Sequence, residues 1–404
     1  MSEFHSYGPE AAVRHTPDPR QVRFAMSGLV LLGMCVGLLG AVLPLWSFEL
    51  SLDAVNAGRA FLALAGGAAA GAIVASWILS GHPLRAHRTF RYSAWTAAAG
   101  LVAVSLAPGA AMLAYPLAAL GLGIGGVIRT TAAALEGALT YKRASGLMHL
   151  AGVAFGFGAV GVCVAAWALN NWVGSARLLW GVALVFAALG WFSGIRVKAP
   201  EQAPPKAAAW RSVLTPIGGL LGAGLLLQAA NFGAVGGWLG LYVFRKLGVT
   251  IDTSLAILAL FWLAVTSGRV AAARLPVATR RMRVATGVTM TAVLGAAFLL
   301  NTVDASGAIV GALLLGAAVG AAHPLTLGAV TQRFAFEQQG VVRLFTVGSL
   351  VAGLGFAWLM APLSIAWGID VVVWSAVFCN VASLIALTLI VLETRLSQHP
   401  AEAR

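Results

Sequence analysis

The chain has 404 residues, of which 60% are hydrophobic and only 10% are charged, and its formal net charge is +13. No soluble fold of this length needs so apolar a composition, so the balance excludes the soluble classes and indicates a polytopic membrane protein. The positive charge alone would also fit a nucleic-acid-binding protein. Its distribution along the chain decides between the two.

Twelve apolar segments along the chain are each long enough to cross a bilayer. They are predicted at residues 24–46, 58–80, 90–107, 110–135, 147–169, 176–195, 213–243, 253–274, 284–301, 307–330, 343–365 and 371–392. The sequence therefore predicts an all-α membrane protein with twelve transmembrane helices.

Lysines and arginines gather at one side of these predicted spans. With both termini placed in the cytoplasm, 21 of the 26 basic residues flank cytoplasmic span ends, 4 flank the outer ends, and Arg129 lies within a span. This imbalance is the positive-inside pattern, and it predicts a multi-pass protein of the bacterial inner membrane with both termini cytoplasmic. The basic charge thus reflects topology, and we expect no nucleic-acid partner.

A polar break rich in proline, alanine and lysine divides six spans from six, and its composition is typical of a linker between two bundles. The predicted organisation is a cytoplasmic tail at 1–21, a six-helix bundle at 22–195, a linker at 196–211, a second six-helix bundle at 212–393 and a tail at 394–404. We expect these two bundles to be pseudo-symmetric.

The two halves share a pattern of small residues. Gly71 in the second span and Gly268 in the eighth occupy corresponding places 197 residues apart. Gly126 in the fourth span and Gly320 in the tenth correspond at a spacing of 194. Two offsets this close predict parallel repeats of six helices each.

Six spans on each side of a cytoplasmic linker resemble the major facilitator superfamily. Within it, NFGAVGGWLGLYVFRKLG (231–248) and LFWLAVTSGRVAAARL (260–275) resemble the fucose permease-like branch of sugar:proton symporters, which often has a GGW-L-x-x-Y run in span seven and a GR-x-x-x-x-R run closing span eight. The residues at those positions here are Gly236, Gly237, Trp238, Tyr242, Gly268, Arg269 and Arg274. The resemblance implies two bundles that rock about one central solute site, formed where spans one, four, seven and ten meet.

The cytoplasmic loops depart from the superfamily's pattern. The loops SGHPLRAHRTFR (80–91) and ARLPVATRRMR (273–283) keep basic residues but lack the aspartate of the usual G-x-L-x-D-R-x-G-R/K run. That aspartate normally helps to latch the bundles together. The predicted gating residues are therefore basic ones: Arg85, Arg88, Arg269, Arg274 and Arg280.

Arg129 lies in the fourth predicted span, about two helical turns before the loop that follows. Placing arginine inside an apolar span costs at least ~2.5 kcal/mol, so a functional role is the default hypothesis. Its planar fork would bind a carboxylate or phosphate in bidentate fashion, with Thr130 beside it. Two alternatives stay open: the side chain reaches the cytoplasmic surface, or carbonyls and amides satisfy it and the solute is neutral.

The alignment of the halves places His323 opposite that arginine. All thirteen acids fall in loops, tails or the last residue of a span, so His323 is the candidate proton carrier, because histidine titrates near physiological pH. The alternative is a neutral histidine bonded to a carbonyl at a proline kink. Gln228 and Asn231 share one face of span seven and are expected to line the site, with Trp238 and Tyr242 as aromatic walls for a sugar-like ring.

The sequence predicts secondary active or facilitative transport of a small polar solute, either an organic or sugar acid or a sugar. The expected partners are the solute, protons if transport is coupled, and membrane lipid, and we expect a monomer without cofactor or metal. No nucleotide-binding run, defensible Ser/His/Asp grouping or metal-ligand spacing indicates an enzyme. Two alternatives stay open: drug efflux, which the missing G-P signature in span five disfavours, and a non-transporting membrane assembly or sensory protein on the same fold.

Overall fold

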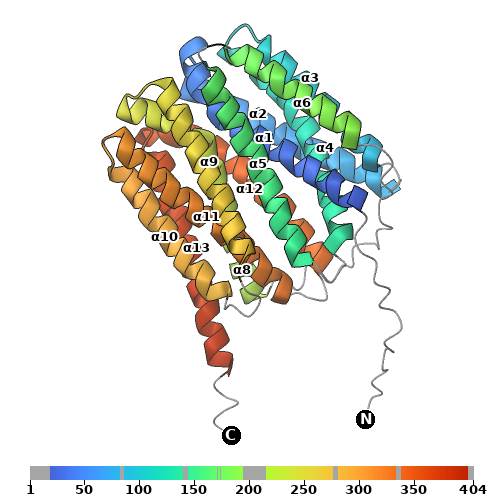
Figure 1. Ribbon diagram of the computed structural model, residues 1–404, viewed down its shortest axis with the longest axis vertical. Coiled ribbons are helices and arrows are strands. Elements are labelled where there is room, and N and C mark those ends of the chain that lie inside the picture. Colours follow the sequence, from blue (N-terminus) through green and yellow to red (C-terminus); the bar gives the residue numbers. More distant parts are fainter. Residues whose placement is uncertain are drawn as a thin grey trace.

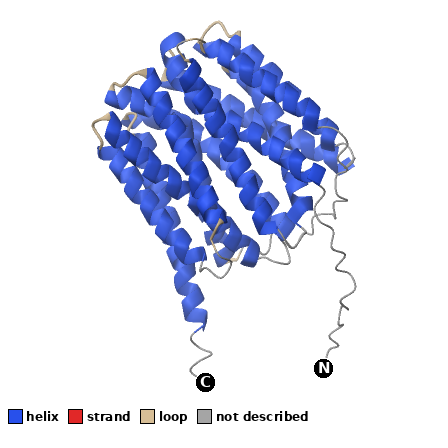
Figure 2. Ribbon diagram, in the orientation of Figure 1, coloured by secondary structure: helices blue, strands red, loops and turns tan. Residues whose placement is uncertain are grey.

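The computed structural model describes residues 19–81, 86–139, 144–170, 172, 174–193, 215–275, 281–333 and 338–398. Within these ranges the regular structure is helical, as Figure 2 shows. The helices are α1 (Pro19–Glu49), α2 (Ala54–Gly81), α3 (Ala86–Ser105), the short 3-10 helix η3 (Ala110–Met112), α4 (Ala114–Leu139), α5 (Ala144–Leu169), α6 (Ser175–Ser193), α8 (Pro216–Leu247), α9 (Ile251–Ala273), α10 (Arg281–Asn301), α11 (Ala305–Arg333), α12 (Gln338–Trp367) and α13 (Val371–Gln398).

The twelve long helices confirm the predicted all-α membrane fold. Ten of them are long and apolar enough to cross a membrane by the described residues alone. Helix α3 is not among the ten because its first two turns carry basic and polar residues, and α12 contributes a shorter apolar stretch, Ala352–Trp367. The predicted linker at 196–211 and the outermost tail residues lie outside the described ranges.

The same helix pairs pack together in both halves of the chain. In the first half α1 packs on α5, α2 on α4, and α3 on both α4 and α6. In the second half α8 packs on α12, α9 on α11, and α10 on both α11 and α13. Figure 1 shows α3 and α6 along one side of the molecule, α10 and α13 along the other, and α5 beside α9 between them.

Glycines at equivalent positions create these contacts, because a helix without a side chain at the crossing lets its neighbour's backbone come close. A Cβ added to Gly71 would overlap the carbonyl oxygen of Leu122, and one added to Gly268 would overlap that of Ala317. Both are contacts between the second and fourth helices of a half. The 197-residue correspondence predicted for these glycines is therefore repeated in the packing.

The second predicted correspondence is wrong by one residue. Gly320 meets the carbonyl oxygen of Val265, and the equivalent contact in the first half is made by Gly125 with Ala68, whereas Gly126 faces α3. Adjacent glycines look alike in a sequence, and only the neighbouring helix distinguishes them. The corrected register moves the partner of Arg129 from His323 to the next residue along α11.

The two halves meet chiefly where α1 packs on α8, α5 on α9, and α2 on α12. We call the end where α1 ends and α2 begins the turn end, and the end where α1 begins the terminal end. Side chains from α1, α8, α9 and the residue that follows α5 bond across the halves at the turn end. This boundary between the halves is where a central site would lie.

Candidate functional site

Polar contacts join the two halves at the turn end. Arg245 at the end of α8 donates from Nη2 to Ser47 Oγ on α1 at 2.9 Å and to the Leu52 carbonyl oxygen at 3.3 Å. Asn170, which follows α5, donates from Nδ2 to Asp252 Oδ1 on α9 at 2.8 Å. These five residues form what we call the turn-end latch, which holds the halves together on this side.

Trp238, predicted to line the site, is fully buried just inside the turn-end latch. Its Nε1 donates to the carbonyl oxygen of Ala357 on α12 at 2.8 Å, and its ring stacks on Phe61 of α2 with centroids 5.7 Å apart. Trp238 therefore packs where the second half meets α2. In this arrangement its contacts with α2 and α12 help to close the turn end.

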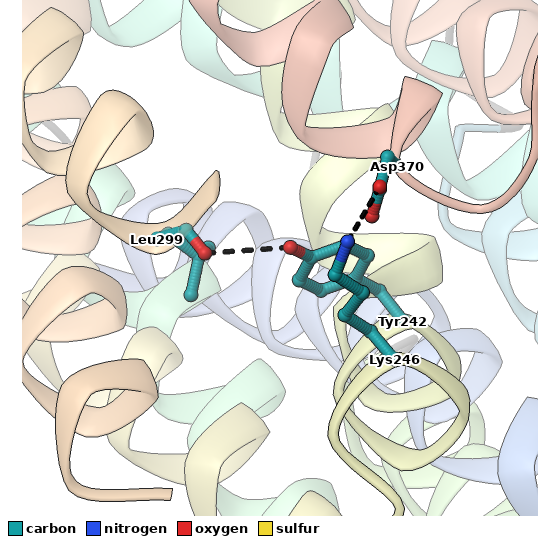
Figure 3. A network of polar contacts seen from close by, with 4 residues as sticks. All are labelled: Tyr242, Lys246, Leu299 and Asp370. Carbon is teal, nitrogen blue, oxygen red and sulfur yellow. Dashed lines mark hydrogen bonds and ion pairs between the residues drawn. The ribbon is translucent and has the colours of Figure 1, made fainter. Parts of the chain in front are cut away.

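Tyr242, one turn further along α8, is also fully buried. Its hydroxyl donates to the carbonyl oxygen of Leu299 on α10 at 3.3 Å (Figure 3). Beside it, Lys246 Nζ and Asp370 Oδ2 form an ion pair at 2.6 Å that ties α8 to the start of α13. The tyrosine is thus directed into the second half near the turn end.

Arg129 is buried, with 7% of its surface exposed. Its Nε donates to Ser76 Oγ on α2 at 3.0 Å, and this burial argues against a side chain that reaches out to the headgroups. Thr130 is fully buried and donates to the carbonyl oxygen of Gly126 one turn earlier at 2.7 Å. Helix α2 therefore positions the guanidinium within the first half.

Gln228 and Asn231 are nearly fully buried, and their amide nitrogens bond within the second half. Gln228 Nε2 donates to Thr326 Oγ1 on α11 and to Ser383 Oγ on α13, both at 3.2 Å. Asn231 Nδ2 donates to Asn380 Oδ1 on α13 at 3.1 Å. The amide oxygens of Gln228 and Asn231 are buried and have no hydrogen-bond partner among the described residues, and both side chains are directed into the second half, towards α11 and α13.

His323 lies in α11, which continues through Pro324 as one helix. Its ring meets Phe232 of α8 edge-on at 6.1 Å between centroids, and Phe232 in turn stacks on Trp262 of α9 at 6.3 Å. Neither Nδ1 of His323 nor Nε1 of Trp262 has a hydrogen-bond partner in the part of the chain that the structure describes. The helices α8, α9 and α11 thus bring two open ring nitrogens close to Phe232.

Arg269 was predicted as a gating residue in the run that closes span eight. It lies inside α9, is 8% exposed, and donates from Nη1 to the Gly152 carbonyl oxygen on α5 at 2.8 Å. Arg274 is the C-cap residue of the same helix, and Arg88 is exposed near the start of α3. The other two predicted gating residues, Arg85 and Arg280, lie outside the described ranges.

The partner residues Ser76, Phe155 and Phe232 were missed by the sequence reasoning. A buried serine or phenylalanine carries no local signal, although Phe232 directly follows Asn231 and could have been grouped with it. Among the residues that the structure describes, no group of three His, Cys, Asp or Glu side chains could hold a metal ion.

No family profile matches the chain, and no curated protein matches it. Solved structures do match. The chain is similar to FucP, described as a major facilitator superfamily transporter in the outward conformation, with a TM-score of 0.66 and 14% identity over 91% of this chain and 98% of that one. A structure of the E. coli fucose:proton symporter FucP matches with a TM-score of 0.63, 14% identity and the same two coverages.

A structure of the nucleoside transporter NupG matches with a TM-score of 0.69 and 11% identity over 91% of this chain and 99% of that one. Identities this low show a shared fold. The chain therefore has the fold of major facilitator transporters and resembles FucP, which confirms the resemblance predicted from its sequence.

Proposed function

We propose that this protein is a secondary transporter that moves a small polar solute across the bacterial inner membrane by alternating access. The observation that carries this proposal is the two-half fold, shared over 91% of the chain with proteins described as a fucose:proton symporter and a nucleoside transporter. Paired six-helix halves can expose one central site to each side in turn.

The solute is proposed to bind near the boundary of the halves. The buried amide oxygens of Gln228 and Asn231 would accept hydrogen bonds from hydroxyl groups, and a buried acceptor without a partner is costly unless a ligand or water supplies one. Arg129 and Thr130 are the proposed contacts from the first half. This chemistry suits an organic or sugar acid, or a sugar.

The turn-end latch supports a state that is closed on the outer side, if the terminal end is cytoplasmic as the positive-inside pattern predicts. Trp238 and Tyr242 would then contact the solute only after the turn end opens. The bundle and linker bounds predicted from the sequence stand as part of this proposal, as do the basic gating residues at the terminal end: Arg85, Arg88, Arg269, Arg274 and Arg280.

Proton coupling is proposed to run through His323, because every carboxylate of the sequence lies outside the span interiors. Its open Nδ1 could take up or release a proton as the site changes access. Without such coupling the protein would be a facilitative carrier.

The test is solute counterflow into proteoliposomes that contain the purified full chain. Sugars, sugar acids and small carboxylates form the panel, and empty liposomes are the control. We expect saturable exchange of at least one member. Absence of exchange for every solute, together with a stable complex with another membrane protein, would favour a non-transporting role.

A further inference from the structure

The guanidinium of Arg269 is held between the two halves by aromatic rings. Its Cζ lies 4.9 Å from the ring centroid of Phe155 on α5 and 5.2 Å from that of Phe232 on α8. Its Nη1 also donates to the carbonyl oxygen of Gly152, and a Cβ at Gly152 would approach Arg269 Cδ to 3.3 Å. Gly152 leaves space for the Arg269 side chain, and the rings of Phe155 and Phe232 contact its guanidinium at the boundary of the halves.

No carboxylate balances this charge within the described ranges, where the one ion pair is that of Lys246 with Asp370 at the turn end. A buried charge without a counter-ion is costly, and cation–π contacts return only about 0.5–2 kcal/mol each. Arg269 is four residues from the end of α9, but its side chain crosses to α5 and is 8% exposed. An anion is the missing partner.

Two further groups that pack on Phe232, the ring beside Arg269, have unused hydrogen-bonding capacity. Trp262 lies seven residues before Arg269 on the same face of α9, is fully buried, and has no partner for its Nε1 in the described structure. His323 Nδ1 is likewise open. Phe232 contacts Arg269, Trp262 and His323, so three nitrogen-bearing side chains surround one ring.

We propose that Arg269, Trp262 and His323 bind the carboxylate group of the transported solute, which makes the substrate class a small organic or sugar acid. This inference rests on the proposed function, since the same boundary must open for the solute to enter and leave. The fork of Arg269 would hold the carboxylate oxygens, and the indole N–H of Trp262 would donate a further charge-assisted bond. Bound there, the anion neutralises the cation that joins α9 to α5.

The binding test uses thermal shift of the purified full chain with matched pairs of probes. Gluconate, glucuronate, lactate and succinate form the anion panel, and glucose and glycerol are the neutral probes. Stabilisation follows affinity by mass action. We expect at least one carboxylate, and neither neutral probe, to raise the Tm of the wild type.

Three variants and one control assign the effect. Arg269→Gln should abolish the carboxylate shift, and Arg269→Lys, which keeps the charge but loses the fork, should weaken binding about tenfold and covers the case in which the glutamine variant misfolds. Trp262→Phe keeps an aromatic ring and should also weaken binding about tenfold, the worth of one bond to a charged group. Arg59→Gln, at an exposed position on α2, should bind as the wild type does.

The inference is overturned if no carboxylate raises the Tm of the wild type, or if Arg269→Gln keeps the full carboxylate shift. It is also overturned if the neutral probes raise the Tm of the wild type as much as the carboxylates do. Counterflow separates this failure from failure of the proposed function. Exchange of a neutral sugar that Arg269→Gln leaves unchanged would support the proposed transport and contradict the anion site. Carboxylate binding that depends on Arg269, without exchange of any solute in proteoliposomes, would support the anion site and contradict the proposed transport.

Discussion

The repeated glycine contacts between helices predict a position-specific loss of stability. A Cβ on Gly295 of α10 would lie 2.6 Å from the backbone nitrogen of Leu315 and 3.0 Å from its Cα on α11. Nonbonded heavy atoms prefer about 3.5–4.0 Å, so α10 and α11 would have to separate by roughly 1 Å at this crossing. Since the clashing atoms belong to the backbone, no side-chain rotation relieves the overlap, and the cost of Gly295→Ala should be about 1–3 kcal/mol.

Gly287 on the same helix is the matched control. A Cβ there meets no atom within 4 Å, so Gly287→Ala should be neutral or stabilising by about 0.5–1 kcal/mol through reduced backbone entropy of the unfolded chain. The two variants should therefore differ by about 1–4 kcal/mol. Gly100→Ala in the first half should behave like Gly295→Ala, because its Cβ would lie 2.5 Å from the nitrogen of Leu120.

The assay is the apparent Tm of each purified variant in one detergent at one scan rate, because membrane proteins of this size commonly unfold irreversibly. We expect the order Gly287→Ala, wild type, Gly295→Ala from highest to lowest Tm. Equal values for the two alanine variants would refute the close approach of α10 and α11, and with it the register of the repeat.

The remaining predictions concern single polar residues. Arg129→Ala should abolish uptake of an anionic solute in proteoliposomes, and unchanged uptake at normal expression would leave it the structural role of tying α4 to α2. His323→Gln should flatten the pH dependence of transport; an unaltered profile would remove it as proton carrier. Arg245→Ala removes two hydrogen bonds across the halves at about 1 kcal/mol each, so the ratio of open to closed molecules at the turn end should rise about 30-fold. Distances between spin labels placed across the turn end should lengthen accordingly. An unchanged distance distribution would contradict the latch. The Ser306 hydroxyl and the Gly307 backbone N–H hold the pKa of Asp304 below its ordinary value. Asp304→Ala should therefore lower the Tm at pH 7, and the difference in Tm from the wild type should shrink as the pH falls through the depressed pKa and the carboxylate is protonated. A difference in Tm that does not change with pH would contradict that stabilisation.

The number and order of the helices followed from the sequence because the bilayer sets a minimum length for each apolar run. The ends were harder to predict. Helix α3 begins at Ala86, inside the segment that the loop pattern assigned to residues 80–91, because a helix continues past the apolar core wherever its backbone stays hydrogen-bonded. Hydropathy therefore predicts which residues lie within the bilayer, whereas the ends of a helix depend on where its backbone hydrogen bonds stop.

The register between the halves could be predicted only to within a residue. Gly125 and Gly126 are equally small, and composition cannot show that the first faces α2 while the second faces Ser93 on α3. One residue turns a helix by 100°, so this slip changed which side chain of α11 was expected opposite Arg129. Packing against a neighbouring helix, which a single sequence does not contain, decides the matter.

The two buried arginines show the same limit at the candidate site. Arg129 was singled out because it lies deep in its own span, whereas Arg269 was grouped with the basic gating residues because it is close to the end of its span. Their exposures are nearly equal, at 7% and 8%. Arg269 is buried by Phe155 and Gly152 of the other half, more than 110 residues earlier in the chain, so depth along a span did not determine its environment. For an arginine near a span end, the environment of the side chain depends on whether another helix lies beside it, and hydropathy along a single span does not contain that information.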